Sequence, residues 1–291
     1  MGSYAYVAPT SIEEAAKVLS EHATSGRRAQ VLAGGTDLLV QMKSVDNEPR
    51  TIVDIKHIED TNRLVIGGNE TFIGAAIPCA VLNENDTLKG LFPGIIEAAD
   101  LIGSTQIQGR ATIGGNLCNS SPAADTTPAI IVNAGVCVIA GLSGQRELPA
   151  QEFVSGVGKN VLRPDEILVG LKFQNPAPGT ADAYLRFIPR TEMDIAVAGC
   201  GVSITIDGRG TCTAAKVAIG AVAPTALLVP AAGAALVGTN LDNAALEAAG
   251  AACSDAASPI SDKRGTVEYR LRVVSVLCQR AVAIAKNRAR R

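Results

Sequence analysis

Two pairs of adjacent glycines constrain how this chain can fold more than any other feature of its sequence. The first pair, Gly34-Gly35, follows a segment at residues 30–33 that is typical of a short buried strand, and it precedes an apolar segment that begins at Leu38. Because glycine has no side chain, the backbone there can turn tightly and can approach another group closely. The pattern predicts a strand, a glycine turn and the start of a helix, with backbone N–H groups free to bind an anion. A tight turn without a ligand explains the same pattern equally well.

The second pair, Gly114-Gly115, stands much later in the chain between Thr112 and Asn116. It repeats the same chemistry in what we expect to be another structural unit, and two such loops facing each other could bracket a diphosphate. Neither pair belongs to the G-x-G-x-x-G fingerprint of dinucleotide-binding folds, which the sequence lacks. Residues 153–160 do not form a Walker A loop, because the first glycine of that motif is missing. The common nucleotide-binding folds are therefore disfavoured.

Composition limits the size class and the partners of the chain. With 291 residues it exceeds what one hydrophobic core usually supports, so we expect two or three compact units. The formal net charge is −2 and the aromatic fraction is 3%, without any Trp, which argues against nucleic-acid binding by base stacking. A basic cluster occurs at residues 286–291, and we interpret it as a solubilising segment or a partner contact.

The cysteines and histidines form no metal-binding pattern. The seven Cys include no C-x-x-C pair, and neither His22 nor His57 lies near a Cys in the sequence. We therefore expect neither zinc nor an iron–sulfur cluster to be bound by this chain. An odd number of Cys, mostly in apolar runs, indicates reduced core thiols. Without a secretory signal or an apolar run long enough to span a membrane, the sequence predicts a cytoplasmic protein.

Hydrophobic periodicity divides the chain into two parts. The pattern of the first part predicts an α-β-β opening followed by antiparallel strands and a helix. The expected helices lie at residues 10–19 and 91–102, and the expected strands at residues 30–33, 51–55, 64–68, 71–74, 136–140 and 167–173. Residues 174–180 carry two Pro and one Gly and predict a linker. The second part predicts a hairpin and two helices, at residues 194–206, 211–222, 226–237 or 241–251, and 267–286.

Several ordered segments resemble the FAD-binding medium subunit of the molybdenum hydroxylases, the family of xanthine dehydrogenase and carbon monoxide dehydrogenase. They cover residues 31–39, 102–104, 111–116, 121–125, 162–168, 186–190 and 194–196. The resemblance implies an α+β fold in which a two-subdomain FAD-binding unit of the PCMH type is followed by a smaller α+β C-terminal domain with a short antiparallel sheet and helices. It implies an FAD-binding domain at residues 1–176, with subdomains at about 1–56 and 57–176, and a C-terminal domain at 180–291.

The resemblance also implies which residues bind FAD, and it implies no catalytic residue and no metal ligand on this chain. The residues expected around the diphosphate are Val31, Leu32, Ala33, Gly34, Gly35, Thr36, Asp37, Leu38, Thr112, Ile113, Gly114, Gly115 and Asn116. Ile102 is expected against the adenine, and Asp125 and Leu168 toward the flavin. Arg186 stands where the family often has a lysine near the flavin, and residues 189–191 replace paired arginines found in many members. Arginine and lysine differ in hydrogen-bonding geometry, so these departures alter the expected surroundings of the ring.

Three of these residues have simpler interpretations that need no cofactor. Asp125 precedes Thr126 and could cap a helix. Arg186 on a strand could belong to a surface ion pair. Leu168, within an apolar run, is typical of a core position.

The function implied by the resemblance is electron transfer within a larger complex. Electrons would leave a substrate at a molybdenum centre, cross two 2Fe-2S clusters, reach FAD on this chain and pass to an external acceptor. The molybdenum cofactor and the clusters would reside on a large and a small partner subunit, assembled as a dimer of heterotrimers. One alternative is a self-contained FAD-dependent oxidoreductase, although the sequence offers no His or Tyr cluster for acid–base chemistry. A second alternative is a non-catalytic nucleotide-binding or assembly module, in which loss of the glycine pairs would be expected.

Overall fold

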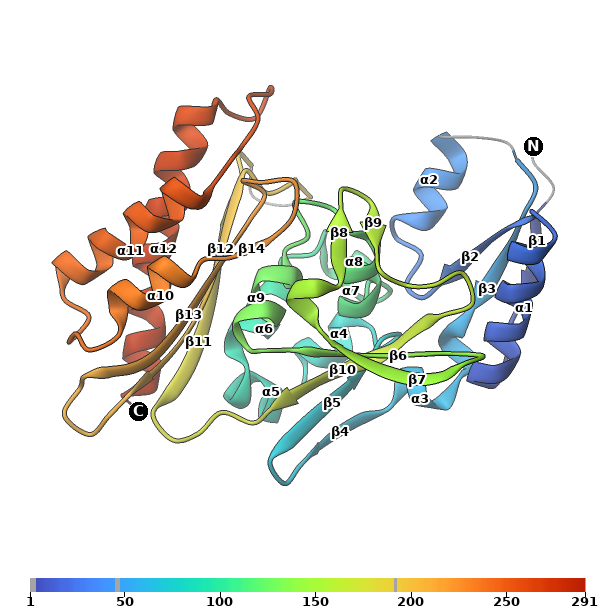
Figure 1. The fold of residues 1–291 in the computed structure, drawn as a ribbon, viewed down its shortest axis with the longest axis horizontal. Helices are drawn as coiled ribbons and strands as arrows, with labels where there is room; N and C mark the ends of the chain where they lie inside the picture. The colour runs from blue at the N-terminus through green and yellow to red at the C-terminus, as the bar shows by residue number, and fades with distance from the viewer. Residues whose placement is uncertain (1–3, 45–47, 191–192, 291) are drawn as a thin grey trace.

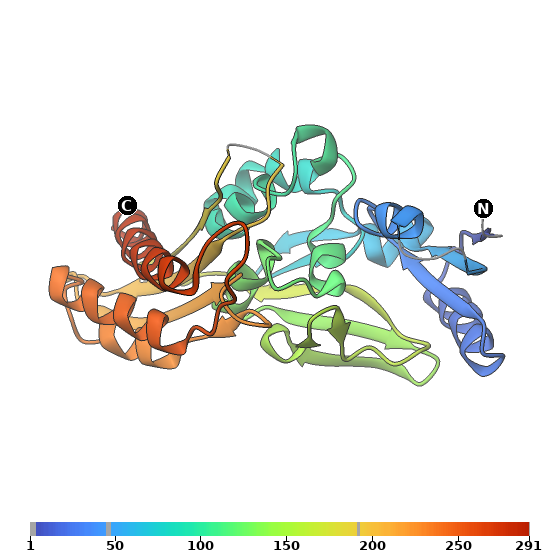
Figure 2. The ribbon, with the colours of Figure 1, turned by 90° about the horizontal axis from the view of Figure 1, so that it is seen from above.

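The computed structural model describes residues 4–44, 48–190 and 193–290, which form three larger β-sheets in a row with helices between and around them (Figure 1). Seen from above, the N-terminal and C-terminal sheets lie at opposite ends of the molecule, with the middle sheet and its helices between them (Figure 2). The α+β class predicted from the sequence is confirmed.

The first sheet is parallel, with the strand order β1-β3-β2. Its strands are β1 (Tyr4–Val7), β2 (Arg28–Leu32) and β3 (Arg50–Asp54), and the connections contain α1 (Ile12–Thr24) and α2 (Leu38–Ser44). The Ser11 hydroxyl caps α1 by accepting the Glu14 N–H, and acidic residues occupy its first turn, as the helix dipole favours. Ala15 and Leu19 of α1 pack on Val53 and on the second sheet. In this parallel sheet, the carboxyl end of β2 leads directly into the segment that contains the first glycine pair.

The second sheet is antiparallel, in the order β4-β5-β10-β6-β7. Its strands are β4 (Leu64–Gly67), β5 (Glu70–Gly74), β6 (Val136–Gly141), β7 (Gly144–Pro149) and β10 (Ile167–Gln174), and η1 (Ile55–His57) and α3 (Glu59–Asn62) lead into it. Alternate residues face opposite sides, as the pleat requires, except across a register shift between Leu168 and Gly170 of β10, which reverses the alternation there. Ile73 and Leu171 face a helical layer, whereas Phe72 and Val169 pack against α1 and the first sheet.

A helical layer fills the space between the second and third sheets (Figure 1). It comprises α4 (Cys79–Asn83), α5 (Asp86–Leu91), α6 (Pro93–Asp100), α7 (Thr105–Gln108), α8 (Ile113–Asn119) and α9 (Thr126–Val132). A 3-10 turn, η2 (Ala150–Glu152), and a small hairpin, β8 (Val154–Gly156) and β9 (Lys159–Asn160), follow the second sheet's edge. The second glycine pair therefore lies in this layer, in the first turn of α8.

The third sheet is antiparallel, in the order β11-β12-β13-β14. Its strands are β11 (Thr180–Phe187), β12 (Ala198–Ile206), β13 (Cys212–Gly220) and β14 (Leu227–Leu228), and α10 (Pro230–Leu236), α11 (Asn243–Ala256) and α12 (Val267–Ala289) cover one face. Helices α6 and α9 contact its strands from the other side. Among the described residues, no helix is long and apolar enough to cross a membrane.

Several sequence expectations need correction. The strand expected from residue 194 begins at Ala198, and Asp194 lies before it, where it accepts a hydrogen bond from Arg190 Nε at 2.9 Å. The periodicity did not delimit β11, and both alternatives for the helix after residue 225 are present. The second glycine pair is helical rather than looped. By contrast, the expectation of free core thiols is confirmed for six of the seven Cys, which are buried, whereas Cys118 is half-buried. Thr191, part of the expected departure at residues 189–191, lies outside the described residues.

Candidate functional site

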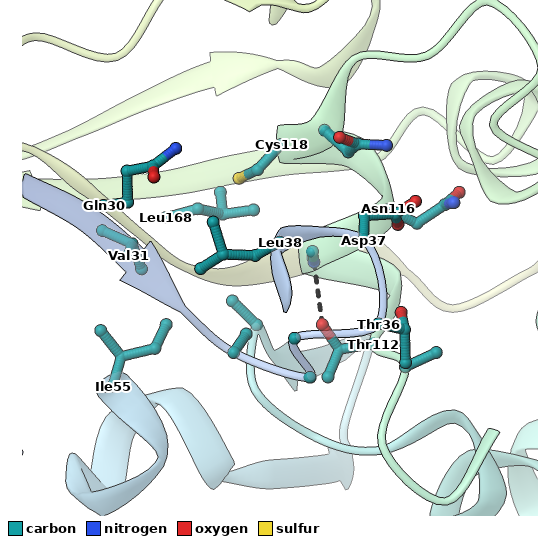
Figure 3. A pocket seen from close by; sticks show the side chains of 18 of the residues that line it. Gln30, Val31, Thr36, Asp37, Leu38, Ile55, Thr112, Asn116, Cys118 and Leu168 are labelled. Carbon is teal, nitrogen blue, oxygen red and sulfur yellow. Dashed lines mark hydrogen bonds between the residues drawn. The ribbon is translucent and has the colours of Figure 1, made fainter. Parts of the chain in front are cut away.

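A cavity of about 340 Å³ opens between the segment from β2 to α2 and the helical layer (Figure 3). Its walls come from β2, the first glycine turn and α2 on one side, and from α8, β9 and β10 on the other. The expected cofactor-binding residues that line it are Val31, Ala33, Gly34, Gly35, Thr36, Asp37, Leu38, Ile102, Thr112, Gly114, Gly115, Asn116 and Leu168. The expected residues that do not line it are Leu32, Ile113, Asp125 and Arg186.

The two positions of the first pair require glycine for different physical reasons. Gly35 has a φ of +77°, a left-handed conformation that L side chains rarely adopt. Gly34 allows close packing, because a Cβ there would lie 2.1 Å from the carbonyl oxygen of Arg110. The first turn is therefore pressed directly against the segment that leads into the second pair.

The first glycine turn presents a run of backbone N–H groups without hydrogen-bond acceptors among the described residues. Among the described residues, none accepts a hydrogen bond from the backbone N–H groups of residues 34–38, although the carbonyls of Gly35 and Asp37 accept bonds within α2. Free N–H groups at a strand-to-helix turn are typical of an anion-binding site. The turn thus has the donors that a diphosphate requires.

The second pair is organised by a helix cap. The Thr112 hydroxyl accepts the Gly115 N–H at 2.8 Å and fixes the first turn of α8, the bond drawn as a dashed line in Figure 3. Gly114 packs against Ala75, whose Cα would lie 2.7 Å from an added Cβ. Beyond its chain neighbours and the backbone of α8, an added Cβ at Gly115 would have only two described atoms within 4 Å, Thr112 Oγ1 at 2.9 Å and the Ala33 Cβ at 4.0 Å. The missing side chain of Gly115 therefore leaves room on the cavity side of the helix.

Hydrogen bonds tie the two walls together. Gln41 Nε2 of α2 donates to Asn119 Oδ1 of α8 at 3.1 Å, and both residues line the cavity. The Thr126 hydroxyl donates to Asn116 Oδ1 at 2.7 Å, which holds the amide of Asn116 at the start of α9. The two glycine pairs, 80 residues apart in the sequence, are thus held face to face.

The remaining lining is mostly apolar and carries no cationic side chain. Among the described residues that line the cavity there is no Lys, Arg or His. Partial burial raises the pKa of Asp37 above its ordinary value, and burial raises the pKa of the Cys118 thiol to about 12. An anion in this cavity would therefore be held by backbone N–H groups and not by ion pairs.

The sequence interpretation missed several lining residues, namely Gln30, Gln41, Ile55, Ala75, Ala111, Cys118, Asn119, Asn160, Leu162 and Ile167. Gln30, Ala111, Cys118 and Asn119 adjoin the glycine segments and could have been found by extending them. Ile55 and Asn160 are brought in by tertiary packing and carry no local signal.

Asp125 and Arg186 form a buried ion pair outside the cavity. Arg186 Nη1 donates to Asp125 Oδ2 at 2.7 Å and the Tyr184 hydroxyl donates to Asp125 Oδ1 at 2.9 Å. The two charged side chains are 5% and 9% exposed, so the surface ion pair considered for Arg186 is wrong. The Asp125 side chain does not cap α9, so that alternative is also wrong. Burial raises the pKa of Asp125, against the opposing effect of Arg186. The cluster joins α9 to β11, where the helical layer meets the third sheet.

Comparison with known proteins identifies the fold and the family. Residues 2–175 match the family model described as the FAD binding domain in molybdopterin dehydrogenase, and residues 183–285 match that of the CO dehydrogenase flavoprotein C-terminal domain. The chain belongs to the family of FAD-binding medium subunits of the molybdenum hydroxylases. Its resemblance to that family, inferred from the glycine segments, is confirmed.

Individual relatives match along most of their length. The carbon monoxide dehydrogenase medium chain of Afipia carboxidovorans is 35% identical over 99% of both chains, and the xanthine dehydrogenase FAD-binding subunit of Escherichia coli O157:H7 is 31% identical over 89% of both. Solved structures of carbon monoxide dehydrogenase from Oligotropha carboxidovorans and Hydrogenophaga pseudoflava superpose with TM-scores of 0.93 and 0.92. They are 34% and 32% identical to this chain and cover 99% and 98% of both chains.

The cavity of this family member fits the cofactor of the family. FAD is the cofactor of these flavin subunits, and its diphosphate needs several hydrogen-bond donors. Residues 34–38 supply unpaired N–H groups, and Gly115 leaves space opposite them. Apolar lining residues, among them Val31, Ile102 and Leu168, suit the aromatic rings of the cofactor.

Proposed function

We propose that this chain holds FAD in the cavity and passes electrons from iron–sulfur clusters on a partner subunit to an external acceptor. The observation that carries the proposal is the run of unpaired N–H groups at residues 34–38, set against the glycine pair of α8. When bound, the flavin can accept electrons singly and release them in pairs. The protein supplies position and electrostatics, as is general for cofactor enzymes.

The proposed site assigns a role to each group of expected residues. Residues 31–38 and 112–116 surround the diphosphate, Ile102 lies toward the adenine and Leu168 toward the flavin. Leu32 and Ile113 support the two turns from behind, since Leu32 packs under Gly35 and Ile113 is fully buried. Asp125 and Arg186 act at the flavin end, where the helical layer meets the third sheet.

The proposed assembly follows the names of the relatives. A medium chain of carbon monoxide dehydrogenase implies companion chains of other sizes. We propose a large subunit with the molybdenum cofactor and a small subunit with 2Fe-2S clusters, arranged as a dimer of heterotrimers in the cytoplasm. Residues 1–176 would form the FAD-binding domain, with subdomains at about 1–56 and 57–176, and residues 180–291 would form the C-terminal domain. The two family matches, which end at residue 175 and begin at residue 183, support this division.

The cofactor part is tested by purifying the chain and measuring its absorbance. We expect a yellow protein that releases FAD on denaturation, and an apoprotein that binds added FAD stoichiometrically. A colourless chain that does not take up FAD would refute the proposal. The assembly part is tested by affinity purification from the native source, which should recover one large molybdenum protein and one small iron–sulfur protein.

A self-contained FAD-dependent oxidoreductase is less well supported. Such an enzyme needs a substrate site with acid–base groups beside the flavin. Among the described residues that line the cavity, Asp37 and Cys118 are the only titratable side chains. Steady turnover of a small substrate by the purified chain alone, without partner subunits, would favour this alternative.

A further inference from the structure

A charged cluster lies directly behind the first glycine turn. Asp54, at the end of β3, is buried and accepts hydrogen bonds from the Tyr6 hydroxyl at 2.7 Å and from Lys56 Nζ at 2.7 Å. It also accepts the Lys56 N–H at 3.0 Å and so caps η1. Burial alone would raise the pKa of Asp54, but the hydrogen bonds from Lys56 and Tyr6 hold it below its ordinary value. Asp54 is therefore a fixed carboxylate that anchors Lys56.

The Lys56 ammonium makes a second hydrogen bond, and it is to the glycine turn. Its Nζ donates to the carbonyl oxygen of Ala33 at 3.0 Å. In a trans peptide the carbonyl and the following N–H point in opposite directions. The bond to Lys56 thus fixes the Ala33–Gly34 peptide plane, and the N–H of Gly34 points away from Lys56. That N–H is the first of the unpaired donors that line the cavity.

The contact also has an electrostatic consequence. No Lys or Arg is among the described residues that line the cavity. A hydrogen bond from an ammonium group to a peptide carbonyl polarises that peptide and strengthens its N–H as a donor. The Lys56 ammonium, 29% exposed and paired with Asp54, can therefore act on a bound anion through the intervening peptide without contacting it.

We propose that Lys56 is a positioning residue of the diphosphate site, which orients and polarises the Ala33–Gly34 peptide so that its N–H binds the anion. This inference rests on the proposed function, because it names a part of the same FAD site. It predicts that replacing Lys56 weakens the binding of ligands that carry a diphosphate, whereas the binding of the rings on either side of the diphosphate is not affected.

The test compares Lys56→Met and Lys56→Arg with the wild-type apoprotein. FAD affinity is measured by quenching of flavin fluorescence, and ADP and adenosine are titrated as competitors of FAD. We expect Lys56→Met to weaken FAD and ADP about tenfold, the scale of one charge-assisted hydrogen bond, and to change adenosine less than ~2-fold. Lys56→Arg should recover most of the affinity. Lys89→Met is a matched control, because Lys89 forms an exposed ion pair with Asp86 in α5.

The outcomes separate this inference from the proposed function. If wild-type apoprotein does not bind FAD, the proposed function is refuted and the inference with it. If the wild type binds FAD and Lys56→Met binds it equally well, the inference alone is refuted. An equal loss for FAD, ADP and adenosine would show a general structural role and would also overturn it.

Discussion

A methyl group added at Gly115 would stand in the cavity and not in the protein around it. Its Cβ would meet Thr112 Oγ1 at 2.9 Å, and its next neighbour would be the Ala33 Cβ at 4.0 Å. Gly115 lies in the first turn of α8, and within a helix alanine is favoured over glycine by about 0.5–1 kcal/mol. This gain offsets the displacement of the Thr112 hydroxyl. We therefore expect Gly115→Ala to change the free energy of unfolding of the apoprotein by less than ~1 kcal/mol.

Cofactor binding should respond much more strongly. A methyl group forced into a packed contact costs about 1–3 kcal/mol, which corresponds to an FAD affinity ~5- to ~150-fold weaker. Gly115→Val, with two further methyl groups, should abolish retention of FAD during purification. Flavin fluorescence quenching gives the dissociation constant, and urea unfolding of the same apoprotein samples gives the stability.

Two further variants make the result interpretable. Gly90→Ala is the matched control, because Gly90 lies in α5 with no atom within 4 Å of an added Cβ, and it should bind FAD like the wild type. Gly34→Ala should lose both stability and FAD, since its Cβ would lie 2.1 Å from the carbonyl oxygen of Arg110. If Gly115→Ala binds FAD with wild-type affinity, the second glycine pair is not part of the cofactor site and the reasoning fails.

Three other predictions concern charge. Since no Lys or Arg is among the described lining residues, FAD affinity should change less than ~3-fold between 50 and 500 mM NaCl, measured by the same titration, and a tenfold loss would contradict binding by backbone N–H groups. Arg186→Met leaves Asp125 buried without its cation and should lower the free energy of urea unfolding by about 3–5 kcal/mol, part of which the double variant with Asp125→Asn should restore. Burial raises the pKa of Asp182 to about 6, so its contribution to stability is present at low pH and is lost as the pH rises through 6. Asp182→Asn should remove this decline from a series of unfolding curves between pH 4 and 8, and an unchanged pH profile would exclude Asp182 as its source.

The backbone part of the site was predictable because it depends on local sequence. Gly34-Gly35 follows an apolar strand and precedes a helix, and the structure has this order in β2 and α2. A residue pair that demands close approach or a left-handed φ leaves a signal in the sequence itself. Thr112, two residues before Gly114, could likewise have been recognised as a helix cap, but the glycines after it favoured a loop interpretation.

The parts that were missed depend on contacts between distant segments. Lys56 carries no local signal for a role at Ala33, since the contact arises because β3 is the central strand beside β2. Arg186 was correctly placed on a strand, but its burial depends on how β11 packs against α6 and α9. The position of Leu168 on the cavity side of β10 coincides with a register shift between Leu168 and Gly170, which single-sequence periodicity does not reveal.

The chemistry of the cavity lining favours electron transfer over a self-contained reaction on a substrate. The thiol of Cys118, whose pKa burial raises to about 12, is not a base at neutral pH. Asp37 is the one carboxylate among the described lining residues, and in Figure 3 it lies near Thr36 and Asn116, beside the two glycine segments. In the proposed site Asp37 would lie at the diphosphate, away from the flavin ring that a base for substrate oxidation would have to serve. Electron transfer needs no proton-abstracting group of the protein at the ring, so the almost uncharged, mostly apolar lining of the cavity supports the proposed function over the self-contained alternative.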